Sequence, residues 1–331
     1  MTTTTSGGRG TPNRVRVAEV PDVRRTMYLR SLSRVADLSR EEVTGLFTLT
    51  DRLRFGAASA PLANKIVCTL FFEPSTRTRL SFESAALRLG ASILSVPDGR
   101  VTAVDKGESL GDIGRMLDSY ADLVVLRHPS ARALAEFRAV GATVPLVNGG
   151  DGQCEHPTQA LSDWYTLSRA GTFTQPLHIG VIGIPAQMRT LRSFLLMGLR
   201  NFAHAIGRIT VYSPSDEPLD QEIADLAEEE GVPVRCSTDL AGTEHELDVI
   251  YLNSLTNFNG RYEFVNTDFR LSLANKLKPE CLVMHPLARG AELDTSLDDT
   301  PHNLYFRQSA NAVFVRQALL TAILGGPDQA A

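Results

Sequence analysis

The sequence predicts an α/β protein built from two doubly wound parallel-sheet domains that are joined by helices. The first observation is length, because 331 residues are more than one hydrophobic core usually serves. The second is alternation: short apolar runs and helical patterns follow one another along most of the chain. That order is typical of parallel strands covered by helices on both faces.

The first half of the chain is predicted to hold a tail and a first domain over 27–155. Residues 1–26 open with a Thr- and Gly-rich stretch that lacks the apolar core of a signal peptide, so we expect a disordered tail. Ser39, with Glu42 three residues later, forms a capping box that predicts the start of a helix. Strands are expected at 65–72, 92–96, 122–127 and 143–147, and a helix at 79–89.

The polar, Gly-rich stretch VNGGDGQCEHP, 147–157, predicts the junction between the two domains. The second domain is expected over 156–309, and the final amphipathic helix, 310–327, should pack back on the first domain. Within the second domain we expect helices at 157–169, 187–200 and 219–230, and strands at 176–182, 208–213, 248–252 and 281–285.

The composition argues against several classes of protein. Lys and Arg number 33 against 38 Asp and Glu, and the formal net charge of −5 argues against a nucleic-acid-binding protein. The four cysteines lie far apart without a C-x-x-C pair, which fits a reducing cytoplasm better than a disulfide framework or a zinc site. No apolar stretch reaches the length of a membrane span. We therefore expect a cytoplasmic protein with no membrane or nucleic-acid partner, no metal and no cofactor.

The stretch FFEPSTRTRLSFESAALRLG, 71–90, predicts an anion site at the start of a helix. The hydroxyls of Ser75, Thr76 and Thr78 and the guanidinium of Arg77 follow directly after an apolar strand. Free backbone N–H groups and the helix dipole favour an anion there, and an arginine can hold a phosphate or carboxylate through two hydrogen bonds. The alternative is that Ser75 only caps the helix while the arginines lie in solvent.

Other strand ends and helix starts also carry polar residues. Arg127 ends a predicted strand, at the carboxyl edge where α/β sheets bind ligands. His156 precedes Pro157 at a helix start, and Gln159 follows in the first turn. The sequence HPLAR, 285–289, ends another strand. Each is weak evidence alone, because a single His before a helix is more often a cap or a surface residue.

Taken together, these motifs resemble the aspartate/ornithine carbamoyltransferase family, which carries S-T-R-T-R, a strand end R-H-P, H-P-T-Q and H-P-L-P-R in this order. The resemblance extends from about residue 30 to residue 325. HPLAR is closer to the aspartate branch, the aspartate carbamoyltransferase catalytic chain, since the ornithine branch has H-C-L-P there. DKGESLGDIGRML also resembles that branch's mobile loop, with Lys106 as its lysine and Thr102 where a serine is usual.

The resemblance implies a carbamoyltransferase whose first domain binds carbamoyl phosphate and whose second domain binds an amino acid. The implied carbamoyl-phosphate site contains Ser75, Thr76, Arg77, Thr78, Arg127, His156, Gln159 and the backbone carbonyl of Leu287, with Thr102 and Lys106 from a neighbouring chain of a homotrimer. Of these residues, Thr78, Arg127 and His156 would polarise the carbonyl oxygen. Arg77 and Lys106 would stabilise the departing phosphate.

The acceptor half departs from the aspartate branch. The stretch VIGIPAQMRTLRSFL, which lacks G-x-G-x-x-G, resembles the segment whose arginine holds the α-carboxylate, and this implies that role for Arg189. Ser254 and Thr256, just after Asn253, stand where the branch has the Arg and Gln that hold the β-carboxylate. The second Pro of H-P-L-P-R is Ala288. Without the bidentate Arg, the site loses charge-assisted recognition of a β-carboxylate.

Three interpretations follow. The favoured one is a carbamoyltransferase for an amino acid other than aspartate, for example 2,3-diaminopropionate, with Asp105 or Asn253 near the second amine. The second is an aspartate carbamoyltransferase of pyrimidine synthesis that holds the β-carboxylate through Arg289 or Lys106. The third is a catalytically silent paralogue acting as an assembly subunit, against which the intact donor motifs argue. The sequence leaves a regulatory subunit undetermined.

Overall fold

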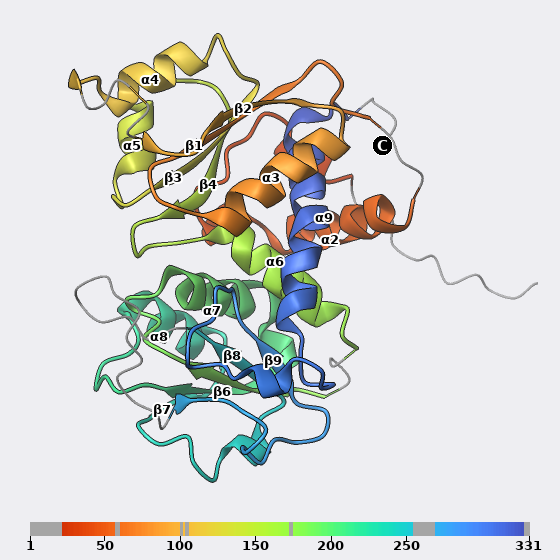
Figure 1. Cartoon of the computed structure of the whole chain (residues 1–331), viewed down its shortest axis with the longest axis vertical. Helices are drawn as coiled ribbons and strands as arrows, with labels where there is room; N and C mark the ends of the chain where they lie inside the picture. Colours follow the sequence, from red (N-terminus) through yellow and green to blue (C-terminus); the bar gives the residue numbers. More distant parts are fainter. Residues whose placement is uncertain are drawn as a thin grey trace, which may run out of the picture.

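The computed structural model describes residues 22–56, 60–99, 102, 106–171, 175–253 and 269–327. Two lobes, each built around a parallel sheet, lie one above the other, with helices between and around them (Figure 1). The predicted fold class is confirmed.

The sheet of the first lobe has the strand order β2-β1-β3-β4. Successive side chains of its central strands alternate between two hydrophobic cores, one on each face of the sheet. Val67 and Val125, for example, face the larger core, whereas Cys68 and Val124 face the smaller one. The elements of this lobe are β1 (Ile66–Phe71), α3 (Thr76–Arg88), β2 (Ser92–Val96), α4 (Leu110–Leu117), β3 (Leu123–His128), α5 (Ala133–Arg138) and β4 (Leu146–Asp151).

The sheet of the second lobe has the order β7-β6-β5-β8-β9. All six residues of its central strand β5 are buried, as expected for a strand covered on both faces. The elements of this lobe are β5 (Leu177–Ile182), α7 (Arg189–Phe202), β6 (Ile206–Tyr212), α8 (Gln221–Glu229), β7 (Val234–Ser237), β8 (Val249–Leu252) and β9 (Leu282–Met284). The helix α6 (Pro157–Ser168) lies between the two lobes (Figure 1). Short 3-10 helices are η1 (Val35–Asp37), η4 (Ala203–Ala205), η5 (Glu244–Glu246) and η7 (Thr295–Leu297).

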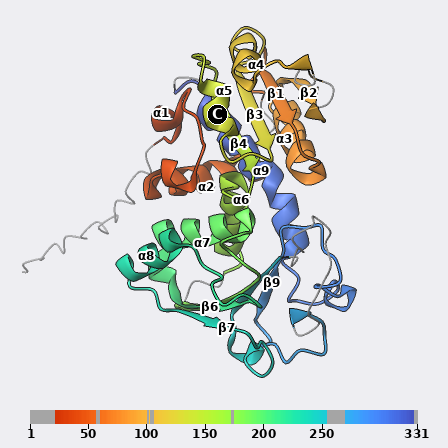
Figure 2. The same ribbon diagram turned by 90° about the vertical axis from the view of Figure 1, so that its left-hand side faces the viewer.

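The last helix, α9 (Tyr305–Leu324), runs along both lobes (Figures 1 and 2). It packs against α3 and α6 and against α2 (Arg40–Phe55), which begins at the predicted Ser39–Glu42 capping box. The expected packing of this helix on the first domain is confirmed, although the helix starts earlier than residue 310. None of the helices in the described ranges is long and apolar enough to cross a membrane.

Three predictions about individual segments are corrected by the structure. The disordered tail does not extend to residue 26, because Val23 and Met27 are buried on either side of α1 (Arg24–Met27); residues 1–21 lie outside the described ranges. The polar junction at 147–157 does not begin at 147, because β4 continues to Asp151, and the strand β7 has no predicted counterpart. In β4 the buried Asn148 side chain is tolerated because it donates hydrogen bonds to the Ser33 carbonyl and to Asp151.

Aromatic packing fixes α6 against α7. Trp164 stacks on Phe194 and Phe202, with ring centroids 5.0 and 4.7 Å apart, and its indole N–H donates to the Phe194 carbonyl. Gly198 makes this approach possible, since a Cβ there would lie 2.4 Å from the Trp164 ring. The first turns of both helices are thereby held in a fixed relation to each other.

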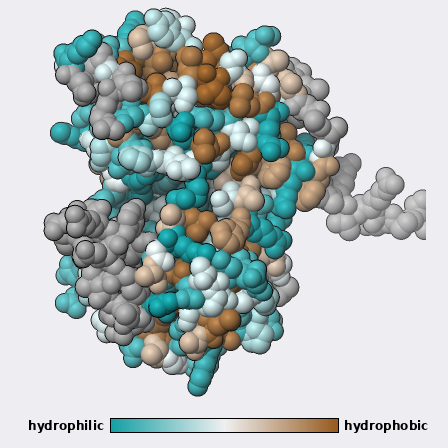
Figure 3. All heavy atoms as spheres, viewed as in Figure 1, coloured by the Kyte–Doolittle hydropathy of each residue, from teal (hydrophilic) through white to brown (hydrophobic). Residues whose placement is uncertain are grey.

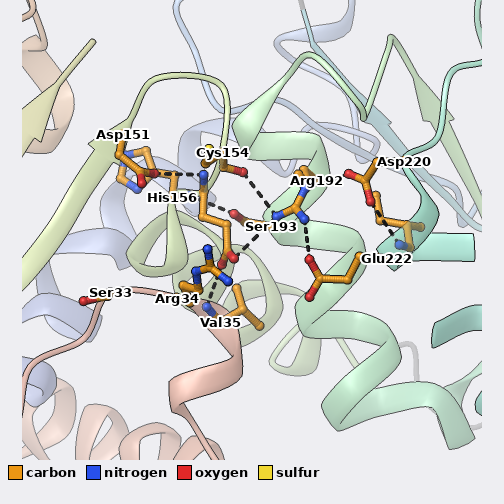
Figure 4. Close-up of polar contacts among 12 residues, drawn as sticks. Ser33, Arg34, Val35, Asp151, Cys154, His156, Arg192, Ser193, Asp220 and Glu222 are labelled. Carbon is orange, nitrogen blue, oxygen red and sulfur yellow. Dashed lines mark hydrogen bonds and ion pairs between the residues drawn. The ribbon is translucent and has the colours of Figure 1, made fainter. Parts of the chain in front are cut away.

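A polar network around Glu155 fixes the junction between the lobes (Figure 4). Glu155 follows β4 and is buried, and burial raises the pKa of its carboxyl. The carboxylate accepts the backbone N–H of Val35 at 2.6 Å and lies 3.4 Å from a guanidinium nitrogen of Arg192 on α7. Arg192 also donates to Asp220 and pairs with Glu222 at the start of α8. The N-terminal segment, the strand-to-helix junction and the second lobe are therefore tied to one another.

Glu155→Ala should lower the free energy of unfolding by about 2 kcal/mol, because it leaves the buried N–H of Val35 without an acceptor. Urea denaturation measures this loss. The matched control is Glu222→Ala, which removes a more exposed partner of the same arginine and should cost less than about 1 kcal/mol. Equal losses in the two variants would contradict the role assigned to Glu155.

Candidate active site

Three helices begin at one cavity between the lobes. α3 starts after β1, α6 after β4 and α7 after β5, so their first turns come from the carboxyl ends of strands in both sheets. None of the three helices has a side-chain cap, and the Ser75 side chain makes no capping hydrogen bond, which argues against the capping alternative. Backbone N–H groups and the positive ends of three helix dipoles therefore favour an anion in this cavity.

The cavity has a volume of about 560 Å³ and brings most of the predicted site residues together. Figure 3 shows the surface indented between the two lobes, where hydrophilic residues gather. Neither Thr102 nor Lys106 lines the cavity of its own chain, and Asp105, Ser254 and Thr256 lie outside the described residues. The predicted residues that line it are Ser75, Thr76, Arg77, Thr78, Arg127, His156, Gln159, Arg189, Asn253, Leu287 and Arg289.

Thr78 and His156 form the buried end of the cavity. The Thr78 hydroxyl lies 3.1 Å from Nε2 of His156. Thr78 is in the first turn of α3, and His156 stands directly before α6. The backbone N–H of His156 donates to the hydroxyl of Ser193 at 2.8 Å, which fixes the start of α6 to α7 (Figure 4). Burial lowers the pKa of the His156 imidazole well below its usual value, and the positive charges of Arg127 and Arg189 lower it further. The ring is therefore neutral at physiological pH.

Glu73 holds two arginines of different lobes side by side. Its carboxylate accepts a hydrogen bond from Arg189 at 3.0 Å and lies 3.4 Å from Nε of Arg127. The local sequence patterns did not predict a role for Glu73. The pattern that could have indicated one is a single acidic residue between an apolar strand and a cluster of hydroxyls and arginines.

Gly150 provides the space in which these two arginines approach the backbone. Its φ of +115° suits glycine, and a Cβ would lie 2.9 Å from Nη1 of Arg127 and 3.2 Å from Nε of Arg189. Gly150 of the predicted junction thus lets the two arginines lie close to the end of β4.

The segment after β9 presents the Leu287 backbone to the cavity. The Leu287 N–H donates to Nδ1 of His285, so Nε2 carries the ring proton and donates to Glu292 at 3.0 Å. Burial lowers the pKa of the His285 imidazole, which agrees with a neutral ring. Both terminal nitrogens of Arg289 are bound by Asp298.

The charge of the cavity is strongly positive. Among the described residues that line it, Glu73 is the one acid, against Arg77, Arg127, Arg189 and Arg289. No group of three or more His, Cys, Asp or Glu residues in the described ranges is placed to hold a metal ion. The side chains and helix ends of the protein can therefore stabilise negative charge on a bound molecule.

The two halves of the chain match the two domains of one family. Residues 30–169 match the aspartate/ornithine carbamoyltransferase carbamoyl-P binding domain, and residues 176–323 match the Asp/Orn binding domain of the same family. The aspartate carbamoyltransferase catalytic subunit of Pyrobaculum calidifontis is 39% identical over 308 residues, which cover 90% of this chain and 99% of that protein. The corresponding subunit of Chromobacterium violaceum is 35% identical, with coverage of 90% and 99%.

Solved structures agree with these sequence matches. Aspartate transcarbamoylase from Trypanosoma cruzi, in complex with aspartate and phosphate, has a TM-score of 0.84 and 32% identity, covering 92% of this chain and 98% of that one. The same enzyme in complex with carbamoyl phosphate and aspartate has a TM-score of 0.83, covering 90% and 96%. The chain therefore belongs to the aspartate/ornithine carbamoyltransferase family and is an enzyme of the transferase class.

His156 should stay neutral across the neutral pH range, because burial and two nearby arginines disfavour its charged form. NMR of the ring Cε1–H signal, assigned through its loss in His156→Gln, measures the titration. In urea the same signal should titrate near 6.5, the value of an exposed imidazole. By linkage, the fold should lose stability as pH falls below that value, since the unfolded chain then binds a proton that the folded chain excludes. A titration midpoint of His156 at or above 6.5 in the folded protein would contradict this prediction.

Proposed function

We propose that the chain transfers the carbamoyl group of carbamoyl phosphate to the amino group of an amino acid and releases phosphate. The observation that carries this proposal is the convergence of Thr78, Arg127 and His156 on the open first turn of α3. The first lobe would bind carbamoyl phosphate and the second the amino acid, in line with the family match of each half.

The residue types fit the steps of this reaction. The neutral amine attacks the carbonyl carbon, a C–N bond forms, and negative charge develops on the carbonyl oxygen. Thr78, Arg127 and the neutral His156, which line the cavity, would stabilise that oxygen. The C–O bond to phosphate then breaks, the attacking nitrogen gives up one proton, and the phosphate leaves with the electron pair and takes up that proton. Arg77 and the backbone N–H groups at the start of α3 would stabilise the departing phosphate.

The proposed acceptor is an amino acid other than aspartate. Arg189 would hold its α-carboxylate, while Asn253, at the end of β8, lines the cavity and donates to Thr190 at 2.9 Å. Ser254 and Thr256 follow Asn253, in place of the Arg and Gln of the aspartate branch. A small diamino acid such as 2,3-diaminopropionate suits a site without that guanidinium, because an unpaired β-carboxylate would be costly to bury.

Aspartate is the second candidate, since relatives at 35–39% identity are named aspartate carbamoyltransferase catalytic subunits. In that case another cation would have to hold the β-carboxylate. Arg289 is poorly suited to it, because Asp298 already binds both of its terminal nitrogens. The second candidate would therefore depend on Lys106 of a neighbouring chain as the cation for the β-carboxylate.

Phosphate release at saturating carbamoyl phosphate, measured with aspartate, ornithine and 2,3-diaminopropionate, tests the proposal. We expect kcat/KM for the diamino acid to exceed that for aspartate at least tenfold, the effect of about one charge-assisted pair. Arg77→Ala should be inactive with every amine. The double variant Ser254→Arg, Thr256→Gln should shift preference toward aspartate.

Each result that contradicts the proposal points to a different function. Aspartate as the best acceptor would replace the first candidate by the second. No phosphate release with any amine, although carbamoyl phosphate binds, would favour a silent paralogue.

We also propose that the active form is a homotrimer whose cavities receive Thr102 and Lys106 from a neighbouring chain. Lys106 is exposed, and neither residue lines the cavity of its own chain. In the proposed trimer, the cavity would be completed by these two residues of another chain.

Mixed oligomers test this assembly. Arg77→Ala and Lys106→Ala should each be inactive alone, and reassembled mixtures should regain activity, because some sites then combine an intact Arg77 with a neighbour's intact Lys106. The control pairs Arg77→Ala with Arg127→Ala, two residues of one cavity wall, and should show no recovery. Verified mixed trimers of the first pair that stay inactive would exclude sharing through Lys106.

A further inference from the structure

Asp163 is fully buried behind the active site and is the centre of a polar cluster. Its Oδ1 accepts hydrogen bonds from the side-chain amides of Gln159 at 2.7 Å and Gln308 at 2.6 Å. Its Oδ2 accepts the hydroxyl of Tyr251 at 2.6 Å. The three donors come from α6, α9 and β8, so this one carboxylate joins three elements that meet at the cavity.

Gln159 is the member of this cluster that reaches the active site. Its side chain lines the active-site cavity and also a second cavity of about 260 Å³ between α3 and α9. A side chain between two cavities has room to turn, and its amide has a donor end and an acceptor end. The hydrogen bond to Asp163 fixes the donor end inward, so the carbonyl oxygen Oε1 points away from Asp163, toward the cavities.

The orientation of the cluster is fixed from the other side as well. The Oε1 of Gln308 accepts the backbone N–H of His285 at 3.1 Å, so its NH₂ group must face Asp163. The NH₂ groups of Gln159 and Gln308 thus both donate to Oδ1 of Asp163, so Oδ1 must be a hydrogen-bond acceptor without a proton. Burial raises the pKa of the Asp163 carboxyl to about 7, and a proton on Oδ2 would still leave Oδ1 as the acceptor. The buried Arg316 on α9 offsets the charge of the ionised form.

We propose that Asp163 is a positioning residue that locks the Gln159 carbonyl toward the donor substrate, so that the site recognises the NH₂ group of a carbamoyl ester. This inference rests on the proposed function, because it assigns Gln159 to the carbamoyl end of carbamoyl phosphate. An acyl phosphate with a methyl group in place of NH₂ offers no donor to Gln159 and leaves its carbonyl unpaired. Discrimination between the two ligands is therefore the property that Asp163 controls.

Calorimetric titration with carbamoyl phosphate, acetyl phosphate and inorganic phosphate measures this discrimination. Asp163→Leu should weaken carbamoyl phosphate binding about tenfold, the loss of one hydrogen bond, with the other two affinities unchanged. Asp163→Asn keeps an oxygen for both glutamines and should retain the wild-type preference. The matched control Tyr251→Phe removes a hydrogen bond on the opposite side of the same carboxylate and should leave the preference unchanged.

The outcomes separate this inference from the proposed function. A wild-type protein that does not bind carbamoyl phosphate would overturn the function itself. Wild-type preference retained in Asp163→Leu, or equal losses for all three ligands, would overturn the role of Asp163 alone. If Asp163→Leu does not fold, a crystal structure of the wild type with phosphonoacetamide decides. A hydrogen bond from the NH₂ group of the ligand to Oε1 of Gln159 would support the inference. A Gln159 side chain turned toward the second cavity would refute it.

Discussion

The carboxylate of Glu73 is the contact on which the geometry of the cavity depends. It lies between Arg127 of the first lobe and Arg189 of the second, two like charges that would otherwise repel each other across the cavity. Because Glu73 stands between β1 and α3, it also fixes where the first turn of α3 meets both arginines. The acid thereby offsets part of the positive charge that the two arginines bring to the cavity.

The gathering of the hydroxyls, arginines and His156 at one cavity was predictable because their motifs lie at strand ends in the sequence. A parallel sheet brings the carboxyl ends of its strands to one edge, so residues that follow separate strands must gather there. Ser75 to Thr78 and His156 come shortly after strands, Arg127 lies near the end of one, and the structure places them around one cavity. The motifs are short, polar and next to apolar runs, which makes them visible without a structure.

The supporting contacts were not predictable from local patterns. Gln308 and Asp163 are 145 residues apart, and neither the buried stripe of α6 nor that of α9 indicates that the two side chains meet. The same holds for Glu155, whose partner Val35 lies 120 residues away. In β4, Asn148 and two glycines gave the composition of a loop, yet hydrogen bonds from neighbouring segments allow a buried strand. Tertiary hydrogen bonds overrode the local preference.

The course of α9 has a consequence for the order in which this protein can mature during synthesis. The helix is made after α2 and α3, yet it covers both, and the Leu29 N–H donates to the Ile323 carbonyl at 2.9 Å. Arg54 of α2 donates to Asn311 of α9 in the same way. The faces of α2 and α3 that α9 covers therefore stay exposed until synthesis has passed α9. During this interval the exposed apolar surface of α2 and α3 makes the nascent chain prone to aggregation.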